Sequence, residues 1–493
     1  MIRPLRIRPL DLIARVAPIG VLFMIAPLHT GAQTAMGAAS AKSRSSSSSV
    51  ASVPNTALAT ALANDMLRIA RLPGMGLAAL DHGKVVYATG VGYRDVAGKR
   101  PVDSSTVFGS ASVAKVVTAT AALRLVQRGV FDLDEPISRR FPDFPGPATQ
   151  ITPRLLAAHL SGIPHYGPGS MPSDRRHIWA SHALGEFSAA RRIGEPGERS
   201  VYSTHGITLM TAMMEQAVQR PILDILRTEV FEPSEMRSSG GLFVDSIPAA
   251  LATLYERSGD SWRALAGPRN LSFAWGGAGL RHTPADLVRM TRPYFDGTFT
   301  ATTLATAFTE QRTRDGGATG LGIVWRVEND WRGRALAHHA GVNPGTRTVV
   351  LMRRDEARAV AVMVNLEWTA SMDRTANVLA EALFDSAPRR VPAAVRGAWA
   401  GRLDSTTVQG QWEFTGDTGW VSVPTVLRER FARSGGVTHD RFPVRAIRDD
   451  LYALITPWGL YPMELTRQGA GVLSARVQVA SQWWTLAPAQ QTP

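Results

Sequence analysis

Hydrophobic and polar positions follow different patterns along this chain of 493 residues, and each pattern predicts a different kind of element. An amphipathic stretch from about Thr56 to Leu72 predicts a helix. Alternating positions over 76–93, with Asp81-His82-Gly83 in the middle, predict a β-hairpin. Mixed helical and strand signals continue beyond the hairpin. These patterns together predict a domain of mixed helices and strands over residues 56–385.

One stretch of this domain is apolar on almost every side. Residues 112–126 carry valine, alanine or leucine at most positions, and Gly129 follows. A helix with this pattern is buried around most of its circumference and ends at the glycine. Lys115 lies in the first turn of this helix. A lysine is rarely found at a buried position, so its presence points to a chemical role.

The composition changes near the C-terminus. Prolines and arginines interrupt the pattern over 386–394, and half of the 12 tryptophans fall within 395–490. Alternating runs at 411–414 and 478–486 predict a small antiparallel β-barrel or sandwich. We expect its aromatic side chains to form the core of this domain. The segment 386–394 is then a linker between two domains.

The first 32 residues have the features of a secretory signal peptide. Four arginines accompany an apolar stretch at 16–28, and the small residues Gly31-Ala32 follow it. This stretch is shorter than the roughly 20 residues of a membrane-spanning helix. We therefore expect cleavage of residues 1–32, a flexible serine-rich linker over 33–55, no stable membrane span, and a secreted or periplasmic location.

Composition limits the chemistry that the chain can perform. It has no cysteine, which excludes disulfides, thiolate-bound metals and a thiol nucleophile. The formal net charge is +13, and the arginines that supply most of it are dispersed along the chain. We expect no nucleic-acid partner and only a loose association with an anionic cell envelope. The histidines lack a metal-binding spacing, and we expect no metal and no cofactor.

Ser112 and Lys115 are the strongest candidates for catalysis. At a spacing of three residues on a helix, their side chains lie on one face within reach of each other. Burial lowers the pKa of a lysine, and a neutral amine can accept the serine proton. The free N–H groups at the helix N-terminus favour an oxyanion beside the serine. The alternative is a capping serine followed by a lysine that extends to solvent.

The segment around these two residues resembles a known family. Phe108 to Lys115 is similar to the S-x-x-K signature of serine β-lactamases and penicillin-binding proteins, close to the class C branch. Five further segments resemble landmarks of that family in the same order, at 131–136, 155–164, 196–204, 276–287 and 339–345. The resemblance implies an α+β fold of the β-lactamase and transpeptidase type, an antiparallel sheet flanked by helices, with a helical lobe.

The resemblance also implies roles for individual residues. Ser112 would be acylated, and Lys115 with Tyr202 would transfer the proton, the tyrosine being held as a phenolate or strong acceptor by nearby positive charge. The backbone N–H groups of Ser112 and Val342 would form the oxyanion hole. His339 would lie across the cleft and contact the substrate or the tyrosine.

Two positions depart from the family pattern and bear on the substrate. Thr204 stands where the family has asparagine, and a single hydroxyl cannot replace both groups of an amide. His339 replaces the lysine of the third motif, and a neutral imidazole is a weaker partner for a carboxylate than an ammonium. We expect Thr204 and Gly341, within the His339 motif, to contact the substrate.

The expected function is that of an exported serine hydrolase, acting through an acyl-enzyme on Ser112 and cleaving an amide, peptide or ester. Its partner is then a small-molecule or peptide substrate. A D-amino-acid peptidase or transpeptidase and a class C-type β-lactamase are alternatives, and so is a penicillin-binding or sensor protein without turnover. The absence of a G-x-S-x-G motif argues against the α/β-hydrolase fold.

Overall fold

The computed structural model describes residues 53–166, 175–368, 370–387, 395–403, 406–425, 428–429, 438–468, 471–479 and 482–488. All of these residues belong to one compact unit. The expected signal peptide at 1–32, most of the expected linker at 33–55 and most of the linker at 386–394 lie outside the described residues.

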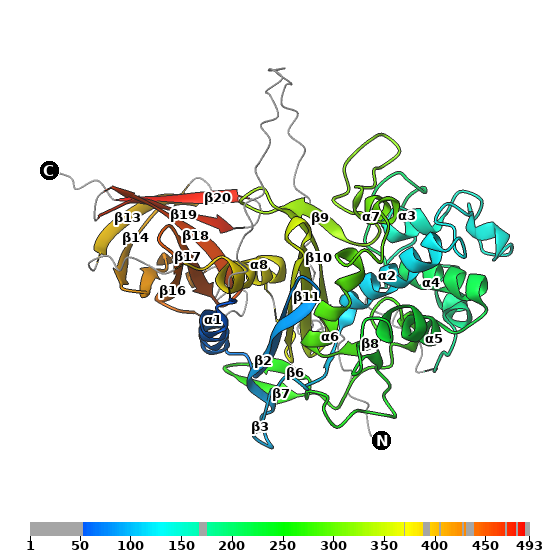
Figure 1. The fold of residues 1–493 in the computed structure, drawn as a ribbon, viewed down its shortest axis with the longest axis horizontal. Coiled ribbons are helices and arrows are strands. Elements are labelled where there is room, and N and C mark those ends of the chain that lie inside the picture. Colours follow the sequence, from blue (N-terminus) through cyan, green and yellow to red (C-terminus); the bar gives the residue numbers. More distant parts are fainter. Residues whose placement is uncertain are drawn as a thin grey trace, which may run out of the picture. The chain divides into compact units, whose positions relative to one another are not determined.

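A seven-stranded antiparallel sheet forms the centre of the α+β domain (Figure 1). Its strand order is β3-β2-β1-β12-β11-β10-β9. These strands are β1 (Gly74–Asp81), β2 (Lys84–Asp95), β3 (Arg100–Pro101), β9 (Arg326–Asn329), β10 (Ala335–Asn343), β11 (Thr346–Arg353) and β12 (Arg358–Val364). The predicted hairpin is confirmed as β1 and β2, and positive φ angles at His82 and Gly83 form its turn.

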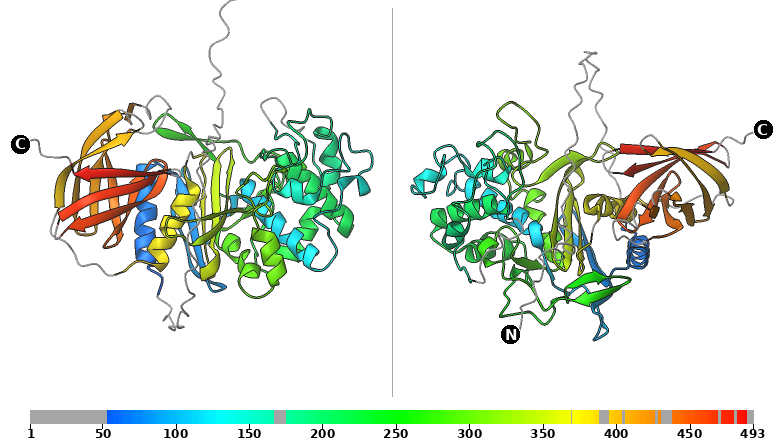
Figure 2. Two further views of the ribbon diagram at one scale, coloured as in Figure 1. Left: turned by 90° about the horizontal axis from the view of Figure 1, so that it is seen from above. Right: turned by 180° about the vertical axis from the view of Figure 1, so that it is seen from behind.

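Helices cover both faces of this sheet. They are α1 (Thr56–Ile69), α2 (Ala114–Gln127), α3 (Pro153–Ala157), α4 (Thr204–Val218), α5 (Ile222–Leu226), α6 (Pro284–Arg289), α7 (Ala301–Phe308) and α8 (Met372–Phe384). Helices α1 and α8 pack on one face, and α6 packs on the other face together with the helical lobe (Figure 2). The two faces bury separate apolar clusters, as expected for strands that are covered on both sides.

Helix α2 lies at the centre of the helical lobe and is buried along almost its whole length, as its apolar sequence predicts. Gly129 follows it with a φ of +70°, a left-handed conformation that glycine adopts without strain. Two small sheets complete the domain: β4 (Phe108–Gly109), β5 (Gly240–Gly241) and β8 (Leu280–His282) in one, and β6 (Tyr255–Ser258) and β7 (Ser261–Ala264) in the other. Strand β4 leads directly into the turn that carries Ser112.

The C-terminal part is a closed eight-stranded antiparallel barrel. Its strands are β13 (Val395–Leu403), β14 (Thr406–Thr415), β15 (Thr418–Ser422), β16 (Arg441–Arg448), β17 (Leu451–Thr456), β18 (Gly459–Gln468), β19 (Gly471–Val479) and β20 (Gln482–Pro488). Trp399, Trp412 and Phe414 lie in its buried core, as expected for aromatic residues on the inward positions of alternating strands. The prediction of a small β-rich C-terminal domain is thus confirmed in its barrel form.

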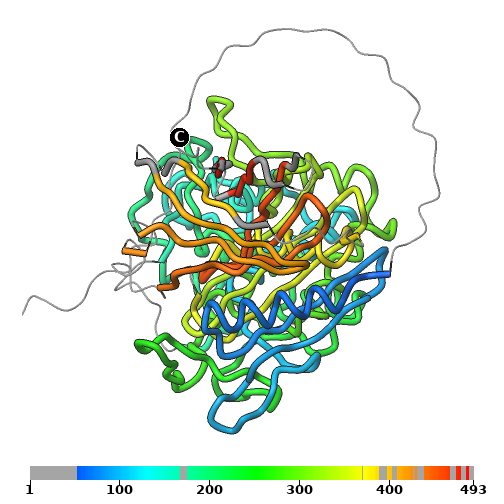
Figure 3. Tube along the Cα trace, turned by 90° about the vertical axis from the view of Figure 1, so that its left-hand side faces the viewer, coloured from blue at the N-terminus to red at the C-terminus, as the bar shows by residue number. Residues whose placement is uncertain are grey.

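The barrel shares a core with the α+β domain. Ile455 and Leu460 belong to the same apolar cluster as α1 and α8, and α1, the blue helix in Figure 3, packs against β17. The Trp368 indole donates a hydrogen bond to the Pro457 carbonyl at 2.7 Å. Glu381 on α8 is fully buried and pairs with Arg448 of β16 at 2.7 Å. In the described residues, no helix is both long and apolar enough to cross a membrane.

Candidate active site

Ser112 lies in a short 3₁₀ turn, Ala111–Val113, between β4 and α2. Ala111, just before the serine, has a φ of +46°. This left-handed conformation is unfavourable for a residue with a side chain, and the contacts around the turn must hold it in place. Ser112 is half-buried, so its hydroxyl remains accessible at the start of a buried helix.

Lys115 is completely buried in the first turn of α2. Its Nζ lies 3.1 Å from Ser112 Oγ and donates a hydrogen bond to the Gly277 carbonyl at 2.6 Å. Burial lowers the pKa of Lys115 well below its ordinary value. One hydrogen of the neutral amine is held by the carbonyl, and its lone pair is free to accept the serine proton.

Tyr202 approaches the serine from the segment before α4. Its hydroxyl donates a hydrogen bond to Ser112 Oγ at 2.6 Å. Burial raises the pKa of Tyr202 to about 12. The expected phenolate is therefore wrong for this structure, because burial raises this pKa by more than the charge of Arg326 and the hydrogen bonds to the hydroxyl lower it. Tyr202 is a protonated donor to the nucleophile.

His339 lies on β10 and is buried and neutral. Its Nδ1 is 2.8 Å from the Ala340 carbonyl, and because a carbonyl only accepts, Nδ1 carries the proton and Nε2 keeps a lone pair. Burial lowers the pKa of His339 well below its ordinary value. The neighbouring His338 pairs instead with Glu328 on β9 at 3.2 Å, as alternation along a strand predicts.

Two further histidines surround Tyr202. The His159 ring lies 4.6 Å from the tyrosine ring, and the His165 ring lies 5.4 Å from it. The Thr204 backbone N–H donates to His165 Nδ1 at 3.1 Å. The sequence pattern predicts no role for His165, although its place directly after the 155–164 landmark is a signal that it lies near the site.

The edge of β10 passes close to the nucleophile turn. A methyl group on Gly341 would lie 2.8 Å from Ser112 N and 2.7 Å from the Ser110 carbonyl, so only glycine fits there. Strand β10 pairs with β9 only as far as His338, which leaves the following residues unpaired on that side. Val342, the expected second oxyanion donor, is 40% exposed at this edge.

The structure does not place Thr204 where the sequence suggested. Its side chain is completely buried, and its hydroxyl, which has no hydrogen bond of normal length, lies close to the phenols of Tyr166 and Tyr202 and lowers their pKa slightly. Thr204 is therefore closed off from solvent in this structure, and its contact with a substrate stays a prediction. The threonine is the first residue of α4, and its methyl group lies next to Gly277, where a Cβ would come within 2.7 Å of it.

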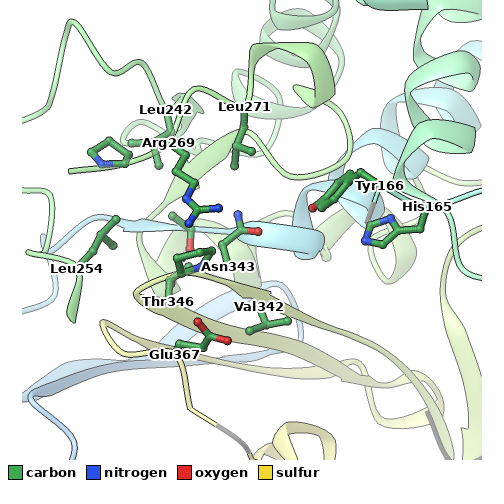
Figure 4. Close-up of a pocket in the computed structure, with 13 residues that line it drawn as sticks. His165, Tyr166, Leu242, Leu254, Arg269, Leu271, Val342, Asn343, Thr346 and Glu367 are labelled. Carbon is green, nitrogen blue, oxygen red and sulfur yellow. The ribbon is translucent and has the colours of Figure 1, made fainter. Parts of the chain in front are cut away.

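A pocket of about 210 Å³ lies beside the nucleophile turn (Figure 4). Gly109 of β4 and Val342 of β10 line it on the side of Ser112. Tyr166, just after the 155–164 segment, and Arg269, in the connection between β7 and β8, also line this pocket. Within the part of the chain that the structure describes, no group of three histidine or acidic side chains could hold a metal ion.

The fold and this cluster define a chain of the β-lactamase and transpeptidase type. The model of the family named Beta-lactamase matches residues 59–384, and the chain belongs to this family. It therefore belongs to a superfamily of serine hydrolases whose members include amidases, esterases and peptidases.

Curated relatives are similar over parts of the chain. Penicillin-binding protein 4* of Bacillus subtilis is 22% identical over 64% of this chain and 73% of its own length. Esterase EstB of Burkholderia gladioli is 30% identical over 40% of this chain. This chain spans about half of the esterase, 53% of its length. The mitochondrial serine beta-lactamase-like protein LACTB of Homo sapiens is 39% identical over 19% of this chain and 18% of its own length.

Solved structures support the fold of both domains. The D-amino acid amidase of Ochrobactrum anthropi is 26% identical, with a TM-score of 0.54, and covers 63% of this chain and 91% of its own. The structure of SurE is 19% identical, with a TM-score of 0.55, over 88% of this chain and 99% of its own. Because the α+β domain alone makes up less than 88% of the chain, the second likeness extends into the barrel.

Proposed function

We propose that this protein is a serine hydrolase that forms an acyl-enzyme on Ser112 and cleaves an ester, amide or peptide bond. The observation that carries the proposal is the placement of one hydroxyl between two groups. Lys115 Nζ lies 3.1 Å from Ser112 Oγ, and the Tyr202 hydroxyl donates to the same oxygen at 2.6 Å. A neutral amine and a neutral phenol at these distances supply a base and a proton donor without a charged residue.

Acylation uses both groups in turn. Ser112 Oγ attacks the carbonyl carbon as its proton moves to Lys115, and the developing oxyanion accepts hydrogen bonds from the N–H groups of Ser112 and Val342. The bond to the leaving group then breaks, and Tyr202 gives that group its proton. The Lys115 ammonium returns a proton to the tyrosine, so the net transfer is from serine to leaving group.

Deacylation follows the same path in reverse. Water takes the place of the leaving group, and its proton passes through Tyr202 to Lys115 as its oxygen attacks the ester carbonyl. The ester bond to Ser112 breaks, and the Lys115 proton restores the serine hydroxyl. The product is a carboxylic acid, and the enzyme returns to its first state.

His339 bears on the choice of substrate. Its Nε2 lone pair accepts a hydrogen bond and repels a carboxylate. The group of the substrate that lies there is therefore a donor, such as an amide N–H, a hydroxyl or the attacking water. This favours neutral esters and amides at the leaving-group side over peptides that end in a free carboxylate, and it agrees with relatives named as an esterase and an amidase.

A fluorophosphonate probe tests the proposal, because it labels a serine only where the serine is activated. Wild-type protein should gain one adduct in intact-mass spectra and release p-nitrophenol from p-nitrophenyl esters. Ser112→Ala should do neither, while the matched control Ser104→Ala, at an exposed serine on the chain leading to β4, should do both. Equal labelling of the wild type and Ser112→Ala would refute the assignment.

The same assays separate the alternatives. Release of D-alanine from D-alanyl-D-alanine peptides at a higher rate than the hydrolysis of any ester would favour the peptidase function. A relative with that function in its name is the D-alanyl-D-alanine-carboxypeptidase/endopeptidase AmpH of Escherichia coli, which is 26% identical. A penicillin adduct that persists without turnover would favour a penicillin-binding or sensor protein.

Export is part of the proposal. It rests on the features of residues 1–32 as a signal peptide. Expression of the full chain followed by N-terminal sequencing of the protein in the periplasmic and external fractions tests it. A mature N-terminus near residue 33 in either fraction would support export, and an intact N-terminus in the cytoplasmic fraction alone would refute it.

A further inference from the structure

The pocket beside Ser112 has walls that are mostly apolar. Leu242 and Leu271 contribute side chains that are nearly buried, and Leu254 adds a third. Gly109, three residues before the serine, also lines the pocket. A pocket with apolar walls beside the nucleophile turn suits the apolar part of an acyl group on Ser112.

Polar groups converge at the centre of this pocket. Figure 4 shows the guanidinium of Arg269, the side-chain amide of Asn343 and the hydroxyl of Tyr166 directed toward the same space. Burial raises the pKa of Tyr166 to about 12, so its hydroxyl is a donor. A guanidinium, an amide NH₂ and a phenol together offer several hydrogen-bond donors, which is the arrangement that a carboxylate requires.

Arg269 and Glu367 are the arginine and the carboxylate that line this pocket. Arg269 is exposed, and among the described residues it forms no ion pair or hydrogen bond. The charge of Glu367 acts, after that of Asp373, on the half-buried Arg347. Arg269 has no such acidic partner among the described residues, so its guanidinium is available to an anion from solution.

We propose that this pocket receives the acyl part of the substrate and that Arg269 selects acyl groups whose apolar chain ends in a carboxylate. The proposal rests on the function proposed above and specifies its substrate class as monoesters or monoamides of dicarboxylic acids. The apolar chain lies against the leucines, and the terminal carboxylate accepts hydrogen bonds from Arg269 and Asn343. The scissile carbonyl then lies at Ser112, and its leaving group departs past His339.

Three p-nitrophenyl esters with equal carbon number test this assignment. The acyl groups are adipate, which ends in a carboxylate, hexanoate, which is neutral, and 6-aminohexanoate, which ends in an ammonium. All three release the same leaving group, so kcat/KM reports only the fit of the acyl chain. We expect kcat/KM to fall in the order adipate, hexanoate, 6-aminohexanoate.

Variants of Arg269 should change this order. In Arg269→Gln the ratio of kcat/KM for adipate to that for hexanoate should fall about tenfold, the usual effect of one charge-assisted hydrogen bond. Arg269→Lys should retain part of the preference, and Arg269→Glu should favour 6-aminohexanoate. The control is Arg139→Gln, which removes an exposed arginine outside the pocket and should leave all three values unchanged. High salt should weaken the preference of the wild type, because the guanidinium is exposed.

Several results would overturn the assignment. An equal or higher kcat/KM for hexanoate in the wild type would show that Arg269 does not bind the acyl chain. A preference for 6-aminohexanoate would show that Glu367 governs the pocket. An unchanged ratio in Arg269→Gln, with native circular dichroism and melting, would remove this residue from recognition. If no ester were cleaved and no fluorophosphonate adduct formed, the proposed function itself would fail, and this substrate class with it.

Discussion

The neutral state of Lys115 has a consequence for stability that can be measured. The side chain is fully buried, and its pKa is lowered well below the ordinary value by that burial. In the unfolded chain the same amine binds a proton at any pH below about 10.4. Folding therefore releases one proton, and the free energy of unfolding of the wild type rises with pH over the range in which the folded amine is neutral.

Replacement of Lys115 by methionine removes this cost and keeps a side chain of similar length. Releasing one proton at pH 7 costs about 4.6 kcal/mol. The Gly277 carbonyl, which now accepts a hydrogen bond from Lys115 at 2.6 Å, would lose its donor at a cost of about 1–3 kcal/mol. Lys115→Met should therefore be more stable than the wild type by about 2–4 kcal/mol near neutral pH, although it can no longer acylate Ser112.

The pH dependence is the sharper readout. The stability difference between Lys115→Met and the wild type should shrink by about 1.4 kcal/mol for each pH unit of increase, because only the wild-type unfolded chain takes up the extra proton. Urea unfolding followed by tryptophan fluorescence at several pH values between neutral and mildly alkaline measures it. Lys84→Met is the matched control at an exposed lysine, and its difference from the wild type should not vary with pH.

A stability difference for Lys115→Met that stays constant with pH would refute the reasoning. It would mean that the folded protein keeps Lys115 protonated, so that the amine is not a base for Ser112. A loss of stability in the variant at all pH values would have the same meaning, because a charged lysine would then be making a favourable interaction that methionine cannot replace.

Three further predictions concern the site and the contact between domains. Tyr202→Phe should lower kcat about 100-fold or more, since it removes the donor to Ser112 Oγ; ester hydrolysis measures it, and a change below threefold would exclude proton transfer by the phenol. Gly341→Ala should lower kcat about 100-fold with the fold retained, because the added methyl lies 2.8 Å from Ser112 N; unchanged turnover would remove the β10 edge from the oxyanion hole. Glu381→Gln should destabilise the protein by about 3 kcal/mol, because this buried carboxylate pairs with Arg353 and Arg448; denaturant unfolding measures it, and an unchanged midpoint would show that the ion pairs do not stabilise the contact with the barrel.

Local patterns were sufficient to predict most elements. The hairpin turn at His82-Gly83 and the buried helix after Ser112 each follow from the pattern of residues within one short segment of the sequence. The barrel was predicted only as barrel or sandwich, because alternation along a strand is the same in both. Closure depends on the pairing of β13 with β20, which are far apart in sequence.

The charge state and surroundings of the site residues could not be predicted in the same way. Tyr202 was expected as a phenolate, but its pKa depends on how completely other segments bury it. Thr204 was expected to contact the substrate, but its side chain is completely buried and lies next to Gly277. Arg269 carries no motif, and only the folded chain brings it to the pocket beside Ser112.

The amino-acid sequence alone determined that a serine and a lysine lie within reach of each other at the start of a buried helix, because a spacing of three residues keeps both side chains within a single turn. Only the tertiary structure decided which groups meet them. Tyr202 is separated from Ser112 by 90 residues along the chain, and His339 comes from strand β10, which lies still further along the chain. The distance between such groups, and the burial that sets their pKa values, depend on the packing of every element around them.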